Sequence, residues 1–261
     1  MRKKRTFVTF ADGEKYEELS IVLGESIRTF SNYDIKIYNK SDFNLTFDVN
    51  FNSSFGYIYK ILSCLKVLEE YDEVVWIDTD CIVTNYIDKI WFETWRLDGY
   101  PLLPKYRFYM FHNRPDNPKV KEISFKKLGL DYIGGDYLQA CFMLFDKTSL
   151  EFFNEVMNVF LNEFTNDEFP FGDETIINCL LRKYKFTDNL GYKFICSQYF
   201  NWRLNKFVKS KNSLDFMEIF DNMKPKDNFF DNILFIHGSK EVKFKRELLE
   251  DLKNKMGVNN I

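Results

Sequence analysis

Hydrophobic and polar residues follow a repeating order along the first third of the chain. Short apolar segments at 5–10 and 35–38 have the length and composition of strands. Between them, residues 14–30 carry apolar side chains at three- and four-residue spacing, which predicts a helix. The same order returns as a helix over 57–71 and a strand over 73–78. This alternation predicts an α/β fold with helices on the faces of a sheet.

The second part of the chain is less regular. Residues 98–136 are rich in proline and glycine, which predicts loops and short elements. Residues 139–146 (QACFMLFD) have the pattern of a buried strand, and Thr148 is expected to cap a helix that runs to about Phe164. The remaining predicted elements are a helix over 172–183, a strand over 233–237 and a charged helix over 240–255.

Length and composition fit one large α/β domain. The chain has 261 residues, of which 45% are hydrophobic and 29% are charged, a balance typical of globular proteins. Its net charge of −3 gives no broad positive surface, so nucleic acid is not an expected partner.

The cysteines and the N-terminus suggest a cytoplasmic location. The 5 cysteines are scattered and form no CxxC pair, which argues against a disulfide framework or a zinc site. The basic start, MRKKR, precedes an apolar stretch too short for a signal peptide, and no apolar run approaches the ~20 residues of a membrane helix. Weak peripheral contact with anionic lipid is a further reading of this start and of the lysine-rich tail, although the interspersed acids favour a solvated helix.

Two carboxylates stand at the end of a strand that the apolar pattern predicts to be buried. In residues 72–83 (DEVVWIDTDCIV), an apolar run leads straight into Asp78 and Asp80. A single aspartate there is ordinary, because it can cap the following turn. Two of them beside a buried strand need a compensating partner, since desolvating a charge is costly. A divalent cation such as Mg²⁺ or Mn²⁺ suits carboxylate oxygens, and ligands of open α/β sheets bind at the carboxyl ends of strands.

Two metal-dependent classes of enzyme use an Asp-x-Asp motif. One is the haloacid-dehalogenase-like phosphatases, in which Asp78 would be the nucleophile. Gly172-Asp173 would then correspond to the late Gly-Asp pair of that superfamily. Their first aspartate normally lies near the start of the domain and is followed by Asp-x-Thr or Asp-x-Val, whereas position 82 here is Ile. The other class is the nucleotide-sugar glycosyltransferases.

Four short motifs in order, from Thr6 to Lys240, resemble the GT-A-fold glycosyltransferases and above all the family 8-like group. The resemblance implies a Rossmann-like, mixed, mainly parallel sheet flanked by helices. It also implies a single domain over 1–261, with a nucleotide-binding half over 1–90, an acceptor-side half over 91–240 and a C-terminal helix over 241–261.

The resemblance implies which residues contact the nucleotide. The segment TFVTFADGEKYEE is similar to the family's opening strand and the residues after it. Lys60, on the helix before the Asp-x-Asp motif, stands where the family has a basic residue that touches the donor, and Lys66 is the alternative. The implied contacts to the donor nucleotide are Thr9, Ala11, Asp12, Tyr16, Lys60, Asp78 and Thr79.

His237 ends the apolar segment ILFIH and is one of 2 histidines. In the family, a late histidine joins the two aspartates as a metal ligand, so Asp78, Asp80 and His237 are the implied ligand set. An imidazole among carboxylates favours Mn²⁺ over Mg²⁺. Gly238 and Lys240 would then hold the diphosphate, although the spacing differs from the commoner His-x-x-Gly-x-x-Lys.

The remaining motifs concern the reacting sugar. Residues 139–146 resemble a family strand in which Gln139 takes the place of Asn. In 172–181 (GDETIINCLL), Asp173 matches the family's first Asp and Glu174 its Gln, while ordinary acids at a helix N-terminus are the alternative explanation. With Asp136, these are the candidate catalytic residues.

The resemblance therefore implies transfer of a hexose from a UDP-sugar to a hydroxyl of a glycan, lipid-linked or protein acceptor, with retention of anomeric configuration. Two alternatives stay open, namely the phosphatase and a non-catalytic GT-A module that binds nucleotide or glycan.

Overall fold

The computed structural model describes the chain in two compact units, each built from separated segments. The first combines Met1–Phe10, Lys36–Ile77 and Trp95–Gly191, and the second Ala11–Ile35, Asp78–Thr94 and Tyr192–Ile261. The predicted single domain with its three parts stays a prediction. The described residues are 3–44, 56–88, 90–93, 98–103, 118–131, 138–164, 168–169, 172–183, 235–237, 241–255 and 257.

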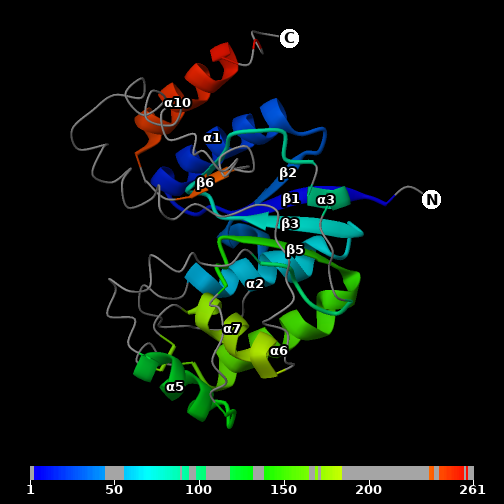
Figure 1. Cartoon of the computed structure of the whole chain (residues 1–261), viewed down its shortest axis with the longest axis vertical. Helices are drawn as coiled ribbons and strands as arrows, with labels where there is room; N and C mark the ends of the chain where they lie inside the picture. Colours follow the sequence, from blue (N-terminus) through cyan, green and yellow to red (C-terminus); the bar gives the residue numbers. More distant parts are fainter. Residues whose placement is uncertain are drawn as a thin grey trace, which may run out of the picture. The chain divides into compact units, whose positions relative to one another are not determined.

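A four-stranded mixed sheet forms the centre of the first unit (Figure 1). Its order is β2-β1-β3-β5, and β1 runs parallel to β3 while β5 runs antiparallel to it. The apolar run that precedes the aspartates forms the inner strand β3, in which Val74 to Ile77 are all buried. Such a run is expected of a strand that is covered on both faces. The strands are β1 Arg5–Phe10, β2 Ile35–Tyr38, β3 Glu73–Ile77 and β5 Phe142–Asp146.

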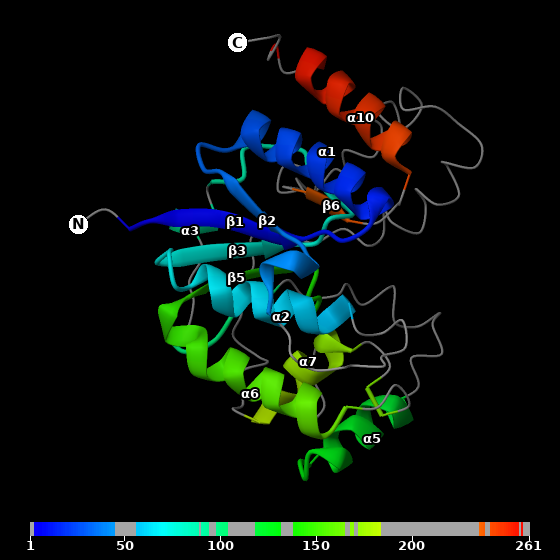
Figure 2. The same ribbon diagram turned by 180° about the vertical axis from the view of Figure 1, so that it is seen from behind.

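Helices α2, α6 and α7 lie on the same side of this sheet (Figures 1 and 2). Helix α2 contacts β1, α6 and α7, and α7 also contacts α6 and α5. The bounds are α2 Gly56–Val67, α5 Pro118–Lys127, α6 Leu150–Asn162 and α7 Asp173–Lys183. Helix α2 thus ends four residues before the predicted end at 71, because its last residues form a hydrogen-bonded turn.

The prediction that Thr148 caps the helix over 150–162 is wrong. Thr148 lies in a 3₁₀ turn, Lys147–Ser149, and its backbone N–H and hydroxyl both donate to the Asp146 carboxylate at 2.9 and 2.5 Å. The N-cap residue of α6 is Ser149. Thr148 is therefore bound to Asp146 at the end of β5, because aspartate side chains readily accept a hydrogen bond from the backbone two residues on.

The second unit contains α1 (Glu14–Phe30), β4 (Cys81–Val83), α3 (Ile90–Glu93), β6 (Phe235–His237) and α10 (Val242–Lys255). Strands β4 and β6 pair antiparallel, and α1 contacts both β4 and α10. The Ser26 hydroxyl on α1 accepts a hydrogen bond from the Val83 N–H at 3.1 Å, which fixes β4 against the helix.

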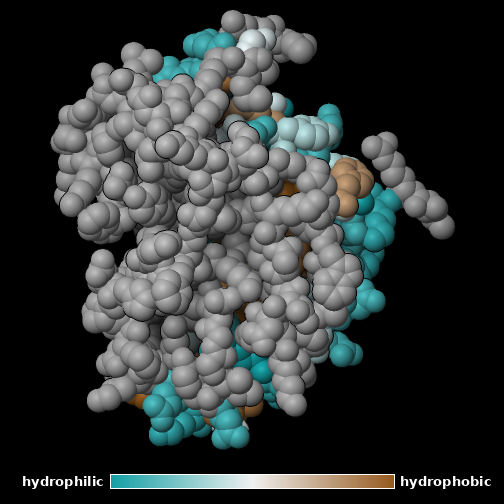
Figure 3. All heavy atoms as spheres, in the orientation of Figure 1, coloured by the Kyte–Doolittle hydropathy of each residue, from teal (hydrophilic) through white to brown (hydrophobic). Residues whose placement is uncertain are grey.

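On the face shown in Figure 3, most of the coloured atoms belong to hydrophilic residues. Within the described parts of the chain, no helix combines the length and the apolar character needed to cross a bilayer. The four described cysteines, Cys64, Cys81, Cys141 and Cys179, are buried, and no disulfide forms among the described residues.

Candidate metal centre

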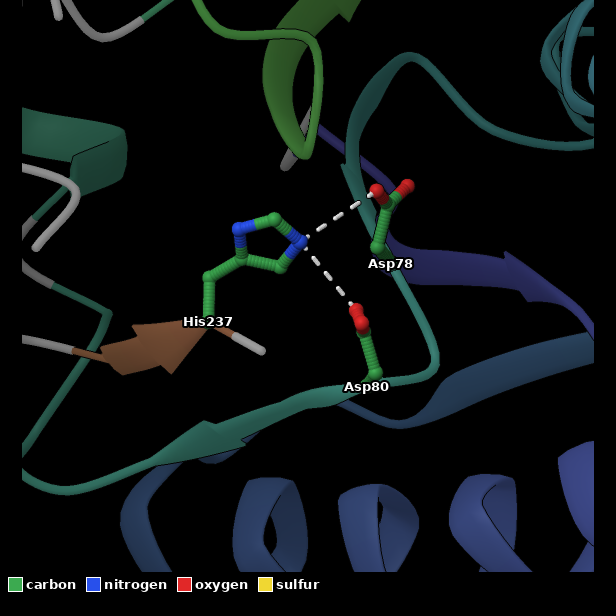
Figure 4. Close-up of side chains that lie close together, drawn as sticks. All are labelled: Asp78, Asp80 and His237. Atoms are coloured by element: carbon green, nitrogen blue, oxygen red, sulfur yellow. Dashed lines mark ion pairs between the residues drawn. The ribbon is translucent and has the colours of Figure 1, made fainter. Parts of the chain in front are cut away.

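The second unit brings Asp78, Asp80 and His237 together (Figure 4). The His237 Nε2 lies 3.2 Å from Asp80 Oδ1 and 3.9 Å from Asp78 Oδ2. One ligand atom from each of the three residues lies within 4.8 Å of the others. This is a spacing at which one cation could bind all three.

Local backbone geometry explains this convergence. The two aspartates flank a tight turn between β3 and β4, closed by a 2.9 Å hydrogen bond from the Cys81 N–H to the Asp78 carbonyl. Both carboxylates therefore point to the imidazole in Figure 4. His237 is the last residue of β6 and lies directly opposite Cys81 in the antiparallel register.

Charge dominates the protonation of His237. Burial by itself opposes the imidazolium, but the attraction and hydrogen bond of Asp80, with a contribution from Asp78, outweigh it and raise the pKa of His237 to about 10. Without a cation, the imidazolium thus balances part of the carboxylate charge. A divalent cation would replace that proton, because a metal-binding histidine must be neutral. Two carboxylates and an imidazole form a donor set that fits Mn²⁺.

A buried lysine also contacts this cluster. The Lys245 Nζ, on α10, donates a hydrogen bond to the backbone carbonyl of Asp80. Burial lowers the pKa of Lys245 to about 8, although Asp80 opposes that shift. The ammonium form therefore still predominates at pH 7. Sequence reasoning missed this residue and treated the helix as a solvated one.

Four of the predicted nucleotide contacts lie between Thr9, in β1, and Tyr16, in α1. Thr9 is buried in the first unit, and its hydroxyl has no hydrogen-bond partner among the described residues. In the second unit Ala11 is buried, Asp12 is half-buried and Tyr16 is exposed at the start of α1. Thr79 is buried between the two aspartates.

The first unit gathers most of the predicted catalytic residues near the start of α7. Gln139 and Asp173 are buried, and the Glu174 carboxylate accepts a hydrogen bond from the Ala140 N–H at 2.9 Å. The Asn178 side chain binds both the N–H and the carbonyl of Leu138 at 2.8 Å. Helix α7 thus holds the segment that leads into β5. The predicted residues Asp136, Gly238 and Lys240 lie outside the described residues.

Lys60 has a partner that the sequence did not predict. Its ammonium lies 2.7 Å from Asp173 Oδ2 and donates to the Ala140 carbonyl at 3.0 Å. It also stands 5.4 Å from the centroid of the Trp76 ring, an arrangement that favours a cation. The pair joins α2 to the first residue of α7.

No protein-family model matches the sequence, and a search of curated proteins finds no match either. Solved structures do match. The bifunctional glycosyltransferase WbbM superposes with a TM-score of 0.54 at 17% identity, over 97% of this chain and 50% of that chain. The chain therefore spans half of the length of WbbM.

The galactosyltransferase LgtC, in complex with donor and acceptor sugar analogs, has a TM-score of 0.51 at 15% identity, over 98% of this chain and 96% of that chain. An active-site mutant of LgtC gives 0.52 at 14% identity, with 98% and 97% covered. At such low identity the similarity concerns the fold. The chain therefore has the GT-A glycosyltransferase fold, with a mixed sheet flanked by helices.

Proposed function

We propose that the chain is a metal-dependent glycosyltransferase that moves a hexose from a UDP-sugar to a hydroxyl of a glycan, lipid-linked or protein acceptor. The observation that carries the proposal is the convergence of Asp78, Asp80 and His237 within 4.8 Å on a GT-A fold.

The chemistry needs positive charge where the diphosphate leaves. A bound Mn²⁺ would stabilise the negative charge that develops on the departing diphosphate. Asp78, Asp80 and His237 would hold this cation, because their donor atoms already face one another. Gly238 and Lys240 follow His237 directly in the sequence, and we assign them to the diphosphate.

Five residues are candidates for binding the nucleotide. We assign Thr9, Ala11, Asp12, Tyr16 and Thr79 to the base and ribose. The Thr9 hydroxyl supports this assignment, since it is buried and has no hydrogen-bond partner in the described part of the chain, which is unusual for a buried polar atom.

The reacting sugar would lie among carboxylates and amides. We assign this role to Asp136, Gln139, Asp173 and Glu174. Lys60 neutralises Asp173, so we propose that it acts on the donor side together with that carboxylate. Retention of anomeric configuration is part of the proposal. The cytoplasmic location and weak lipid contact stay predictions.

One experiment tests the proposal. The protein is incubated with a panel of UDP-sugars and Mn²⁺, and sugar transfer or release is followed by mass spectrometry, with and without EDTA. We expect turnover that needs the metal and is lost in Asp80→Asn. The exposed Asp131→Asn variant is the matched control and should retain turnover.

Other outcomes separate the alternatives. Hydrolysis of small phosphoesters, with a phosphorylated Asp78, would identify a phosphatase and refute the proposal. Binding of UDP without turnover of any donor would identify a non-catalytic module. The glycosyltransferase reading is preferred because each similar structure named above is a glycosyltransferase.

A further inference from the structure

Lys245 occupies a core position of an amphipathic helix. Leu248, Leu249 and Leu252 on α10 are buried, and so is Lys245, one turn before Leu249. The helix packs against α1 in the second unit. A charged residue is rarely found at such a position without a compensating contact, because burial of an ammonium is costly.

The compensating contact is a backbone atom of a predicted metal ligand. The Lys245 ammonium donates to the carbonyl oxygen of Asp80. The N–H of the same peptide group belongs to Cys81 and donates to the Asp78 carbonyl at 2.9 Å. The peptide group between Asp80 and Cys81 is therefore held on both of its sides.

We propose that Lys245 is a positioning residue of the metal centre, which orients the Asp80 carboxylate by fixing the peptide group behind it. The inference rests on the proposed metal-dependent function and adds a residue that does not itself touch the cation. Groups that orient a ligand in this way strongly influence metal affinity.

The positive charge of Lys245 should weaken the binding of Mn²⁺, whereas its positioning of Asp80 should strengthen it. An ammonium near the cation site repels a divalent cation, so its removal alone would tighten binding. Loss of orientation would weaken binding. The two effects change the dissociation constant for Mn²⁺ in opposite directions. The direction of the change in a neutral variant therefore shows which effect is larger.

The test is a titration of Mn²⁺ into protein saturated with UDP, with the free cation measured by electron paramagnetic resonance. Lys245→Met keeps an unbranched side chain that is one atom shorter than lysine and removes its donors. Lys245→Gln is neutral but keeps a donor. Lys243→Met is the matched control, because Lys243 lies on the same helix with its side chain 90% exposed.

We expect Lys245→Met to raise the dissociation constant for Mn²⁺ by about 10- to 100-fold. Lys245→Gln should recover part of this loss, and Lys243→Met should bind as the unaltered protein does. Hydrogen exchange of the Cys81 amide should be faster in Lys245→Met, because one side of its peptide group is released. Thermal unfolding of each variant confirms that the protein measured is folded.

Equal or tighter Mn²⁺ binding by Lys245→Met would overturn the inference, as would unchanged exchange at Cys81 or Gln binding no better than Met. These failures leave the proposed function intact if the unaltered protein transfers sugar with Mn²⁺. Conversely, Mn²⁺ binding that depends on Lys245 in a protein without transfer activity would refute the function and retain the inference.

Discussion

The Lys60 ammonium and the Asp173 carboxylate form an ion pair with 2.7 Å between nitrogen and oxygen, and both side chains are nearly inaccessible to solvent. In the same unit, Lys183 and Glu155 form a pair of equal length in which the side chains are 41% and 29% exposed. The two pairs allow the effect of burial to be measured at constant distance.

Asp173→Ala should destabilise the protein by about 3–5 kcal/mol, because it leaves the Lys60 ammonium buried without its counter-charge. Glu155→Ala should cost about 1 kcal/mol or less, as is usual for exposed pairs. Urea unfolding followed by circular dichroism measures both. In the double variant Lys60→Met/Asp173→Leu most of the stability should return, and equal losses for the two single variants would contradict the prediction.

Gly172 should not tolerate a side chain. Its φ of +53° is unfavourable for other residues, and a Cβ there would meet the Cγ of the Tyr57 ring at 2.7 Å. Gly129 has a similar φ of +64°, but no atom of the described residues lies within 4 Å of a Cβ built there. Gly129→Ala should therefore cost roughly 1–2 kcal/mol from the backbone alone, and Gly172→Ala should cost more.

Denaturant unfolding of both alanine variants gives the comparison. In a Tyr57→Ala background the extra cost at Gly172 should disappear, because the ring that a Cβ would strike is gone. A persistent difference between the two positions in that background would show that contact with Tyr57 is not its cause.

Glu73 should make stability depend on pH. Burial opposes its charge, but hydrogen bonds from Lys3 and Arg5 outweigh burial and hold the pKa of Glu73 below its usual value. Its contribution is complete above the unfolded pKa of about 4.3 and is lost as the pH falls through the lower folded value. The stability difference between the unaltered protein and Glu73→Gln should therefore shrink on acidification.

The measurement is the urea midpoint of both proteins at a series of pH values from neutral to acid. A difference that stays constant throughout would show that the Glu73 carboxylate is not stabilised in the folded state.

Cys179 should react slowly with alkylating reagents. Burial raises the pKa of its thiol to about 12, although Arg182 opposes the shift, so little thiolate is present at pH 8. Iodoacetamide labelling, followed at the peptide level by mass spectrometry, should be slower by about tenfold or more in folded than in urea-unfolded protein. Equal rates in the two states would contradict the prediction.

Local sequence patterns predicted most of the described fold. The helix over 14–30 and the strands at 5–10 and 35–38 have the predicted bounds, because each has enough residues to show its period. Strand β4, Cys81–Val83, was not predicted as a separate element, since three residues are too few to show alternation.

The sequence indicated Asp78 and Asp80 as candidate metal ligands, because two carboxylates follow a buried strand. It could not show which residues far apart in the chain would contact one another. The buried partner of Lys60 comes from a helix far along the chain, and no local period indicates it. Lys245 was detectable in part, because it shares the spacing of Leu248, Leu249 and Leu252. Its positive charge, together with that of the neighbouring lysines, led instead to the interpretation that the helix is solvated.

The pairing of β4 with β6 also determines when the candidate metal site can form during synthesis of the chain. Asp78 and Asp80 are synthesised well before His237, because a long segment of the chain separates Asp80 from His237. A nascent chain therefore carries two of the three candidate ligands while the residues between Asp80 and His237 are still being made. A chain that stops before residue 235 would contain the residues of β1 and β3 but would lack the imidazole of His237.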